Sequence, residues 1–434
     1  MAQWMTNGAG LTTRVVAFAA MVAVCFAHAS NARAATDVRY GLTDDAWLLN
    51  GPGSLDDRLS TLDALGVRVV RFTLHWNQIA TSEPAAPTDP SDPAYDWTKA
   101  SQVLDGLRAN GIEVVVQLLG TPGWANGKKP PNYIPRSSAT FAAFATAAAR
   151  EYPWITKWVI WNEPNQRIWL RPTSPTLYTV RLLNPAYIAI HGAIHDAEVA
   201  GGGTAPRGST GGVSPVAWIT GMHAAHARLD AYAQNPYPLD PKRETPLTGG
   251  CTHCTTITMA TLGRLVTLVA HDWPRARIWL TEYGYQSNPP DKVLGVSPAL
   301  QARYVSEGAY VAYHTPRVDL LIHFLYQDEP KLARFQSGLV TDKAVAKPAL
   351  AAFELPLAET HRTGAETSLW GELRAPAAAH TTATLEERRG STWHAFARIR
   401  PSSNGFYTWR GRLPRHTLIR VRAGPLAGAS LTIV

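Results

Sequence analysis

A regular alternation of short apolar runs and longer helical patterns occupies the chain from about residue 37 to residue 354. Eight apolar runs have the length and composition of strands: 38–42, 67–74, 112–119, 158–163, 198–200, 229–233, 278–282 and 318–326. Stretches with helical patterns separate them, at 55–65, 97–110, 138–151, 184–197, 214–225, 255–271 and 298–314, and a closing helix begins near residue 347. Strands that alternate with helices in this way predict a parallel (β/α)8 barrel, also called a TIM barrel.

An open, doubly wound sheet is the structural alternative to a barrel. It would normally carry a Gly-rich phosphate loop after its first strand, and Gly51-Pro52-Gly53 does not fit that pattern. Local signals support individual helices. Gly111 follows one helix in the usual C′ position, and Asn184 with Pro185 is expected to cap and open another. We therefore predict an α/β fold with a barrel domain over residues 35–357.

The pattern of the sequence changes after Leu357, from alternating strands and helices to successive strand-length segments. Segments 367–373, 381–387, 392–399 and 418–421 alternate or are apolar at strand length, and turn clusters such as 401–405 separate them. This pattern predicts a small antiparallel β-sandwich over residues 358–434. Its aromatic residues, as core or surface side chains, are Trp370, Trp393, Phe396 and Trp409.

The N-terminus has the pattern of a secretory signal peptide over residues 1–34. Arg14 precedes an apolar stretch at 15–27, and the small-x-small sequence Ala32-Arg33-Ala34 follows it. A membrane anchor is the alternative, but about 13 apolar residues fall short of the roughly 20 that span a bilayer. No later segment has the character of a transmembrane helix. We therefore expect a secreted, extracellular protein.

Two cysteines remain after the predicted cleavage, Cys251 and Cys254, in the sequence Cys-Thr-His-Cys. In an exported chain such a pair is expected to form a local disulfide. Free thiols and a metal site are the alternatives, although a zinc site needs four ligands and only His253 is close by. We expect neither a metal ion nor a cofactor.

Positive charge is concentrated in the C-terminal segment. The formal net charge of the chain is +8, and residues 361–434 hold eleven arginines, no lysine and four glutamates. A basic domain after a nearly neutral body suggests contact with an anionic glycan, envelope polymer or lipid headgroup. An arginine-rich surface that only faces water is the alternative. Nucleic acid is not among the expected partners.

Two of the predicted strands end in a glutamate. One reads Trp158-Val159-Ile160-Trp161-Asn162-Glu163, and the other reads Arg277-Ile278-Trp279-Leu280-Thr281-Glu282. Functional residues of a parallel barrel lie at the C-terminal ends of its strands, so Glu163 and Glu282 are expected to face each other across the barrel mouth. Glycoside hydrolysis needs such a pair, one carboxyl to protonate the leaving oxygen and one to attack or to activate water.

The sequence motifs around these glutamates resemble those of a known enzyme family. Trp161-Asn162-Glu163-Pro164-Asn165 is similar to the acid/base signature of clan A, the large clan of (β/α)8 retaining glycoside hydrolases, and Leu280-Thr281-Glu282-Tyr283-Gly284 is similar to its nucleophile strand. The motifs look most like the bacterial cellulase-like (family 5) and family 39 xylosidase-like members. The resemblance covers about residues 37–354, and it implies cleavage of a carbohydrate substrate with retention of configuration.

The resemblance also implies roles for four residues. Glu163 matches the general acid/base, and Glu282 matches the nucleophile that forms a covalent glycosyl-enzyme. Asn162 matches the residue that bonds the sugar 2-hydroxyl. Arg71, at the end of the second predicted strand, matches the arginine that holds the nucleophile ionised and oriented.

Four more residues are candidates for substrate binding by the same resemblance. Tyr237 matches a tyrosine that bonds the nucleophile, and Trp124 matches a loop tryptophan near the sugar. Asn235 stands where the family commonly has His. Tyr326 stands where the eighth strand often ends in a Trp platform. These last two departures concern sugar specificity and leave the implied reaction unchanged.

We therefore predict a retaining glycoside hydrolase in which the two carboxyl groups lie about 5–5.5 Å apart and Glu163 has a raised pKa. The expected substrate is a β-linked oligo- or polysaccharide. A non-catalytic carbohydrate-binding or scaffold protein and a transglycosylase that remodels an envelope glycan are the functional alternatives. Structural alternatives also remain: the glutamates could form ion pairs, and Trp124, Trp161, His75 and Trp76 could simply pack.

Overall fold

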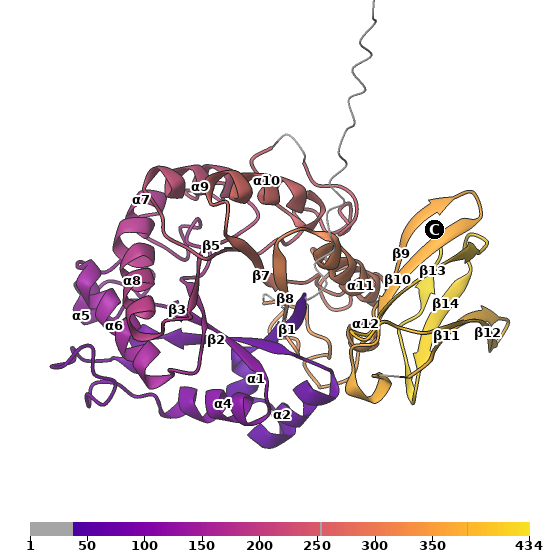
Figure 1. Ribbon diagram of the computed structural model, residues 1–434, viewed down its shortest axis with the longest axis horizontal. Coiled ribbons are helices and arrows are strands. Elements are labelled where there is room, and N and C mark those ends of the chain that lie inside the picture. The colour runs from indigo at the N-terminus through magenta and orange to yellow at the C-terminus, as the bar shows by residue number, and fades with distance from the viewer. Residues whose placement is uncertain (1–37, 252–253, 333, 380) are drawn as a thin grey trace, which may run out of the picture. The chain divides into compact units, whose positions relative to one another are not determined.

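A closed barrel of eight parallel strands forms the body of the protein (Figure 1). The computed structural model describes residues 38–251, 254–332, 334–379 and 381–434. The barrel strands pair in chain order, and β8 returns to pair with β1, so the predicted barrel is confirmed. Their bounds are β1 Arg39–Thr43, β2 Val69–His75, β3 Glu113–Leu119, β4 Lys157–Ile160, β5 Glu198–Thr204, β6 Ala231–Gln234, β7 Arg277–Tyr283 and β8 Val318–Phe324.

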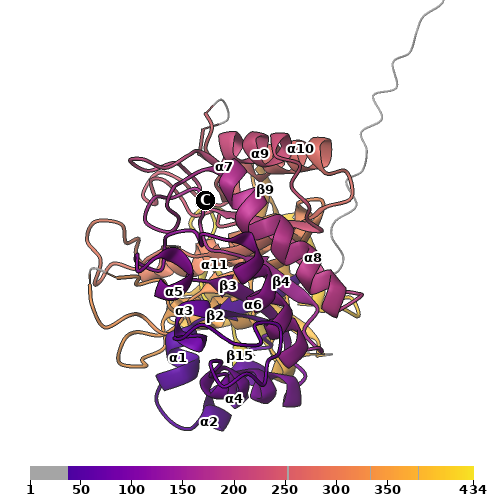
Figure 2. The same cartoon turned by 90° about the vertical axis from the view of Figure 1, so that its left-hand side faces the viewer.

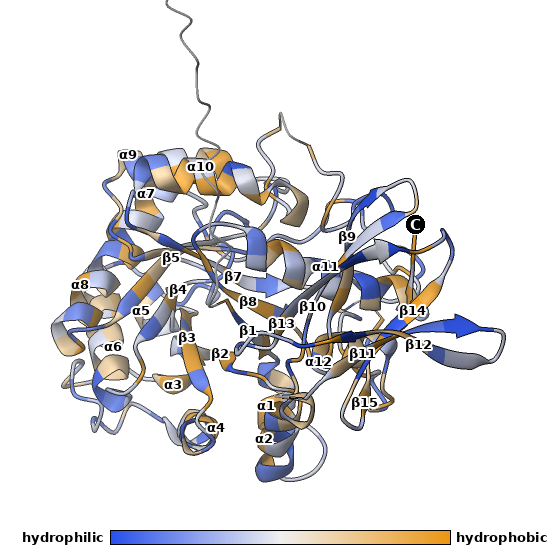
Figure 3. Ribbon diagram, turned by 45° about the vertical axis from the view of Figure 1, so that its right-hand side comes forward, coloured by the Kyte–Doolittle hydropathy of each residue, from blue (hydrophilic) through white to orange (hydrophobic). Residues whose placement is uncertain are grey.

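Helices surround the barrel, and Figures 1 and 2 show α6 and α8 side by side outside β3 and β4. Figure 3 shows strands such as β5 and β7 mainly in the hydrophobic colour, whereas α8 and α9 carry both colours. This is the pattern of strands that are covered on both faces. The helices are α1 Asp45–Asn50, α2 Leu55–Ala64, α3 Trp76–Ile79, α4 Thr98–Ala109, α5 Gly123–Asn126, α6 Ser138–Glu151, α7 Pro175–Tyr178, α8 Asn184–Ala193, α9 Pro215–Ala224, α10 Leu262–Asp272, α11 Pro298–His314 and α12 Pro348–Glu354.

Three barrel strands end two or more residues away from their predicted ends. β4 stops at Ile160 and β8 at Phe324, because Trp161 and Leu325 have φ angles of 72° and 80°, which a strand cannot continue through. β5 instead extends through its glycine run to Thr204. The catalytic candidate Glu163 therefore lies in a turn beyond its strand, whereas Glu282 lies within β7.

The prediction that Asn184 caps a helix is wrong. A π-helical turn at Thr179–Leu183 leads directly into α8, so Asn184 is already a helical residue. Its side chain instead links two segments of chain. The amide nitrogen donates to the His226 carbonyl at 3.1 Å, and the amide oxygen accepts from the Arg228 N–H at 2.8 Å.

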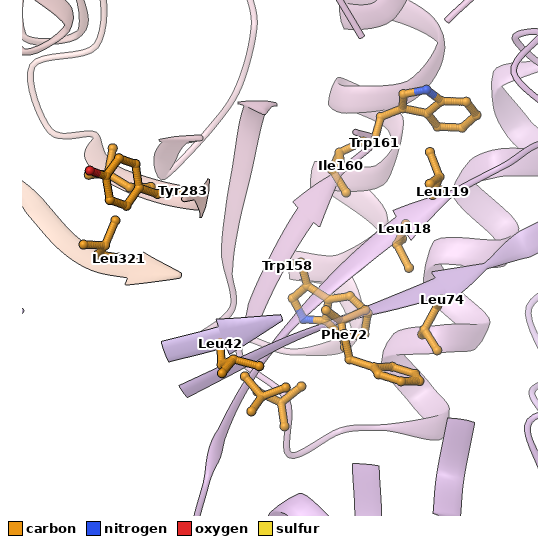
Figure 4. Close-up of a cluster of buried hydrophobic side chains, with 14 of the residues drawn as sticks. Leu42, Phe72, Leu74, Leu118, Leu119, Trp158, Ile160, Trp161, Tyr283 and Leu321 are labelled. Atoms are coloured by element: carbon orange, nitrogen blue, oxygen red, sulfur yellow. The ribbon is translucent and has the colours of Figure 1, made fainter. Parts of the chain in front are cut away.

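Two hydrophobic layers hold the barrel together. The outer layer packs strands against helices, and Figure 4 shows part of it, including Phe72, Leu118 and Trp158. The inner layer fills the barrel itself, where one large side chain, Trp279, lies among small and branched neighbours. These neighbours are Val69, Val115, Val159, Ala200, Ala231, Ala233, Leu320 and Ile322.

Two antiparallel sheets follow the barrel and confirm the predicted β-sandwich. One has the order β13-β10-β9, and the other has the order β12-β11-β14-β15 with β16 also paired to β14. Apolar side chains such as Leu369, Leu385 and Val421 form their common core. The strands are β9 Leu357–Thr363, β10 Glu366–Glu372, β11 Ala383–Arg389, β12 Thr392–Ile399, β13 Phe406–Arg412, β14 Leu418–Ala423, β15 Leu426–Ala427 and β16 Leu431–Thr432.

The sandwich packs on the barrel through β9, β10 and α11. Trp370 of β10 is buried, and its ring lies 5.7 Å from that of Tyr310 and 5.5 Å from that of Tyr313 on α11. The described residues from both parts belong to one compact unit. The predicted division into domains at residue 357 stays a prediction.

The predicted signal peptide at residues 1–34 lies outside the described residues, as does His253. Within the described part of the chain, no helix combines the length and the apolar character needed to cross a membrane. A disulfide joins Cys251 to Cys254 in the segment between β6 and α10, with a Cα–Cα distance of 5.3 Å.

Candidate active site

A cavity of about 510 Å³ opens at the C-terminal ends of the barrel strands. Glu163 and Glu282 both line it. The other lining residues come from almost every strand end and from the loops that follow. They include Asp45, Arg71, Thr73, His75, Gln117, Asn162, Ile168, Trp169, Arg207, Tyr237, Leu294, Phe324 and Phe335.

Glu282 is held by a cation and a phenol. Its Oε1 lies 2.8 Å from Nη2 of Arg71, and its Oε2 accepts a 3.0 Å hydrogen bond from the Tyr237 hydroxyl. The side chains of Arg71 and Glu282 are only 5% and 9% exposed. Because a buried charge is costly unless it is paired, this arrangement stabilises Glu282 as a carboxylate in a fixed orientation. Two residues that the sequence predicted beside Glu282 are therefore in contact with it.

Glu163 has the opposite environment. Burial, and then the negative charge of Glu282, raise the pKa of the Glu163 carboxyl to about 8. Hydrogen bonds from the Asn235 and Trp169 side chains oppose this rise, and Arg71 opposes it less. The Asn235 amide donates to Oε1 of Glu163 at 3.1 Å. At neutral pH Glu163 therefore carries a proton while Glu282 is paired with a cation, which is the division of roles that an acid and a nucleophile need.

The backbone around Glu163 is unusual for residues that have a Cβ. Trp161 and Glu163 have φ angles of 72° and 38°. The Glu163 N–H donates to the Gly203 carbonyl at 2.9 Å, and the Trp161 N–H donates to the Leu118 carbonyl at 2.9 Å. Backbone of this kind costs free energy and persists only where its surroundings hold it.

Glycine makes the approach of β5 to this turn feasible. Gly203 has a φ of 55°, and a Cβ there would lie 3.3 Å from the Trp161 carbonyl oxygen. At Gly202, with a φ of 93°, a Cβ would lie 2.7 Å from the Tyr232 ring. The glycine run in the sequence is therefore a packing requirement next to Glu163.

Other residues of the same motif fix the loop that follows Glu163. The buried Trp161 indole donates to the Trp169 carbonyl at 2.9 Å, which keeps Trp169 near the cavity. Asn165 is fully buried, accepts from the Ala205 N–H at 2.9 Å and donates to the Val213 carbonyl at 3.0 Å. Asn165 therefore ties the loop after β4 to the loop after β5.

The two predicted asparagines both lie near Glu163. Asn162 is buried and lines the cavity, and its amide oxygen lies 3.5 Å from Nε2 of Gln117. Asn235 contacts Glu163, as described above, and accepts from the Thr281 hydroxyl at 2.8 Å. The change from the family's usual His therefore affects the neighbour of the acid/base candidate.

Trp124 and Tyr326, both predicted to bind sugar, are not among the residues that line the cavity. The Trp124 indole donates to the Ala80 carbonyl at 2.9 Å, and its ring meets Trp76 edge-on. Tyr326 lies beyond the turn at Leu325, where its ring packs 4.2 Å from that of Trp47. The reason is that β8 ends early, so Phe324 lines the cavity instead.

Several cavity residues were missed by the sequence analysis. Asp45 follows β1 and accepts from the Thr73 N–H at 3.2 Å, and its position after a strand end was a usable signal. Gln117 points inward from the middle of β3, between apolar neighbours. Trp169 and Phe335 belong to irregular loops, where no periodic pattern reveals which side chains turn inward. Among the described residues, no group of three His, Cys, Asp or Glu side chains is placed to hold a metal ion.

No model of a protein family matches the chain, and no curated protein matches it. Among solved structures, a β-glucuronidase of Bacteroides uniformis is similar at 12% identity and a TM-score of 0.49, over 92% of this chain and 45% of its own. An endo-1,4-β-mannanase of Rhizomucor miehei is similar at 13% identity and a TM-score of 0.47, over 73% and 95% of the two chains. An endo-β-1,3-glucanase of Amycolatopsis mediterranei is similar at 15% identity and a TM-score of 0.40, over 73% and 98%.

This chain covers less than half of the Bacteroides enzyme. At such identities and TM-scores these likenesses concern the fold and say nothing about the reaction of this chain. Membership of family 5 or family 39 therefore stays a prediction.

Proposed function

We propose that this chain is a retaining glycoside hydrolase that cleaves an O-glycosidic bond by double displacement. The observation that carries the proposal is the contrast between two carboxyl groups in one cavity. Glu282 is paired with Arg71 and Tyr237, whereas the pKa of Glu163 is raised to about 8. One acid and one ionised carboxylate are the groups that this reaction requires.

In the first step, an Oε atom of Glu282 attacks the anomeric carbon while the bond to the leaving oxygen breaks. Glu163 transfers its proton to that oxygen, so the aglycone departs as a neutral alcohol. Asn162 lies on the cavity wall next to Glu163, where its amide can bond a sugar hydroxyl. The products of this step are the free alcohol and a glycosyl ester on Glu282.

In the second step, the ionised Glu163 removes a proton from water, and the water oxygen attacks the anomeric carbon. The ester bond breaks and Glu282 regains its negative charge beside Arg71. Departure of the aglycone leaves Glu163 ionised, so the same residue serves as acid and then as base. Two inversions at one carbon give net retention.

The test is release of aryl alcohol from a panel of activated aryl β-glycosides and arabinofuranosides. Wild type is compared with Glu163→Ala and Glu282→Ala, with azide added as a replacement nucleophile, and with Glu83→Ala as an exposed control. We expect turnover of at least one glycoside, lost by about 10³-fold or more in Glu282→Ala and partly restored by azide. Undiminished turnover in both active-site variants contradicts the proposal.

Proton NMR of the first product tests the stereochemistry. If the mechanism is double displacement, a β-glycoside substrate yields the β-anomer first, and this anomer mutarotates later. Initial appearance of the α-anomer indicates that Glu282 activates water directly, as an inverting enzyme does. An added acceptor sugar separates hydrolysis from transglycosylation, because a transglycosylase forms a new glycoside.

Export and a second contact with glycan also belong to the proposal. The support for export is the signal-like N-terminal sequence. Support for the contact comes from β11, where Thr384 pairs with Arg398 on one side and Arg422 on the other, so the two exposed arginines share one face of the sheet. Retention on an immobilised polyuronate at low salt, reduced in Arg398→Glu/Arg422→Glu but not in Thr384→Ala, is the expected result. Equal retention of all three proteins refutes the contact.

A further inference from the structure

The two sides of the cavity differ in chemistry. Polar side chains line the side formed by β1 to β4, and these include Asp45, Thr73, Gln117 and Asn162. The exposed apolar lining residues all belong to the loops that follow β4 to β8. The apolar lining residues of these loops include Ile168, Trp169, Pro206, Leu239, Leu294 and Phe335.

Four of the apolar lining residues are open to solvent. Ile168 is 70% exposed, Trp169 36%, Leu294 47% and Phe335 42%. Single exposed apolar side chains are ordinary on protein surfaces, but a group of them around one opening marks a binding site. They come from three separate loops, so their common position is not a consequence of one hydrophobic stretch of sequence.

Two of the exposed apolar residues lie beside the proton donor. The Trp169 side chain hydrogen-bonds to Glu163, and Ile168 precedes Trp169 in the loop that follows Glu163. Since the acid must lie beside the oxygen that departs, the leaving group is expected to extend over these residues. The polar side, with its donors and acceptors, is left for the sugar that becomes bound to Glu282.

Two polar side chains on the apolar side are already bonded within the protein. The Ser209 hydroxyl is already bonded to the Gln166 side chain, and the Gln286 side chain accepts from the Gln336 N–H at 3.0 Å. Arg207 is the charged exception at the rim.

We propose that the substrate is a glycoside with an aliphatic aglycone, as in a glycolipid, and that the apolar side of the cavity binds the hydrocarbon chain. The proposal rests on the proposed function, because it uses Glu163 to identify the leaving-group side. It replaces the expectation of a polysaccharide leaving group and makes no change to the reaction. The main energetic contribution is removal of the alkyl chain and of the apolar side chains from water.

The test uses methyl, butyl and octyl β-glycosides of glucose, galactose, mannose and xylose, each below its micelle concentration. Binding to the Glu163→Gln protein is measured by calorimetry, and kcat/KM is measured on wild type. We expect affinity and kcat/KM to rise with chain length, approaching about fourfold for each methylene that is fully buried. The matched β-linked disaccharides are expected to gain less than the octyl glycosides.

Substitutions among the four exposed apolar residues at the cavity opening, which we call the apolar rim, show where the alkyl chain binds. Ile168→Asn and Leu294→Asn are expected to flatten the dependence on chain length, whereas Ile188→Asn, on an exposed face of α8, is the matched control. No dependence on chain length, or a larger gain from the added sugar, overturns the proposal. An unchanged dependence in both rim variants also overturns it, because the chain then binds elsewhere.

The calorimetric measurement keeps this proposal separate from the reaction. If no aryl glycoside is hydrolysed, the proposed function fails. Octyl binding that depends on Ile168 and Leu294 then still establishes a site for a hydrocarbon chain. If aryl glycosides are hydrolysed but octyl chains add nothing, the reaction stands and only the aglycone assignment is wrong.

Discussion

Protonation of Glu163 links the site to pH. Since the pKa of this carboxyl is raised to about 8, the proton is held throughout the neutral range and is lost as the pH rises through that value. For substrates with a poor leaving group, we expect kcat/KM to fall above about pH 8, tenfold for each pH unit. An activated aryl glycoside that needs little protonation should show a much weaker fall.

The control for this pH profile is Glu163→Gln assayed on the activated substrate. It should show no descending limb near pH 8, because the titrating group is absent. A descending limb that survives the substitution assigns the pKa to another residue and contradicts the role of Glu163.

Tyr237 offers a second test at the scale of one atom. Tyr237→Phe removes the 3.0 Å hydrogen bond to Glu282 and retains the ring. A hydrogen bond to a charged group contributes about 1.5–3 kcal/mol, so we expect kcat/KM to fall by about 10- to 100-fold. Tyr326→Phe, which changes a hydroxyl outside the cavity, should have almost no effect. Equal losses in both variants refute the assignment.

The sequence reveals individual site residues unevenly. The sequence correctly predicts that four residues lie together: Arg71, Glu163, Tyr237 and Glu282. The reason is that the C-terminal ends of the strands meet at one end of a barrel, whatever conformation the loops adopt. Tyr326 lies outside the cavity because Leu325 ends β8 early, and its positive φ angle cannot be derived from residue type. Trp124 lies outside it because its indole bonds the Ala80 carbonyl, a tertiary contact that the local sequence does not reveal.

At the scale of elements, the contact between β5 and the turn after β4 places Glu163. Gly203→Ala adds a Cβ 3.3 Å from the Trp161 carbonyl oxygen, at a φ of 55°. We expect a stability loss of about 1–2 kcal/mol and a larger proportional loss of kcat, because the Glu163 backbone must move. Urea unfolding and steady-state kinetics measure the two effects separately.

Gly263→Ala is the matched control, since this glycine lies in α10 and a Cβ there meets nothing within 4 Å. It should be neutral or slightly stabilising, because alanine is favoured over glycine in a helix. If Gly203→Ala behaves in the same way, the close approach of β5 does not matter for the site.

A buried ion pair secures the loop after β8. Nζ of Lys347 lies 2.7 Å from Oδ1 of Asp328 and 3.0 Å from the Ser287 hydroxyl, and the side chains of the pair are 5% and 2% exposed. Lys347→Met leaves the carboxylate without its cation, and we expect a loss of about 3–5 kcal/mol in unfolding free energy. Lys347→Met/Asp328→Asn should recover part of it. If the losses of Lys347→Met and Asp328→Asn measured separately add up to the loss in the double variant, the two side chains do not interact.

Elements were predicted best where periodicity is strong. The barrel strands and the long helices, such as α11, appear near their expected positions. The short helices α1, α3, α5 and α7 were not expected, because short segments carry too few residues for a period to be seen. The seven-residue strands β9 and β13 were also not expected. The failed cap at Asn184 has another cause, since a tertiary contact uses the side chain that would have capped the helix.

At the scale of the whole molecule, the C-terminal sheets complete the barrel's core. Trp370 packs against α11, and the buried Arg374 guanidinium lies 4.0 Å from the centre of the Tyr40 ring. Deleting residues 358–434 exposes these surfaces. Loss of one buried Trp side chain alone costs roughly 3–5 kcal/mol, and the deletion removes more than that. We therefore expect insoluble protein or a Tm that is lower by about 10 °C or more. A soluble truncated barrel with unchanged Tm and turnover contradicts this.

The overall architecture follows from the sequence because an alternation of strands and helices has few compact solutions. What the sequence could not provide is the chemistry of the cavity's two sides. That chemistry depends on which loop side chains turn inward, and loops have no repeating pattern to show it. The apolar rim at Ile168 and Leu294 therefore emerges only from the folded chain.

The packing inside the barrel constrains how homologous sequences can vary. Trp279 fills a space that Ala200, Ala231 and Ala233 leave open, and all four are fully buried. A substitution that enlarges one of these alanines requires a smaller residue at position 279, because a close-packed interior tolerates neither overlap nor a void. Across homologues we therefore expect positions 279, 231 and 233 to exchange volume together. Such a covariation would record the history of this core even where the residues at the mouth have diverged.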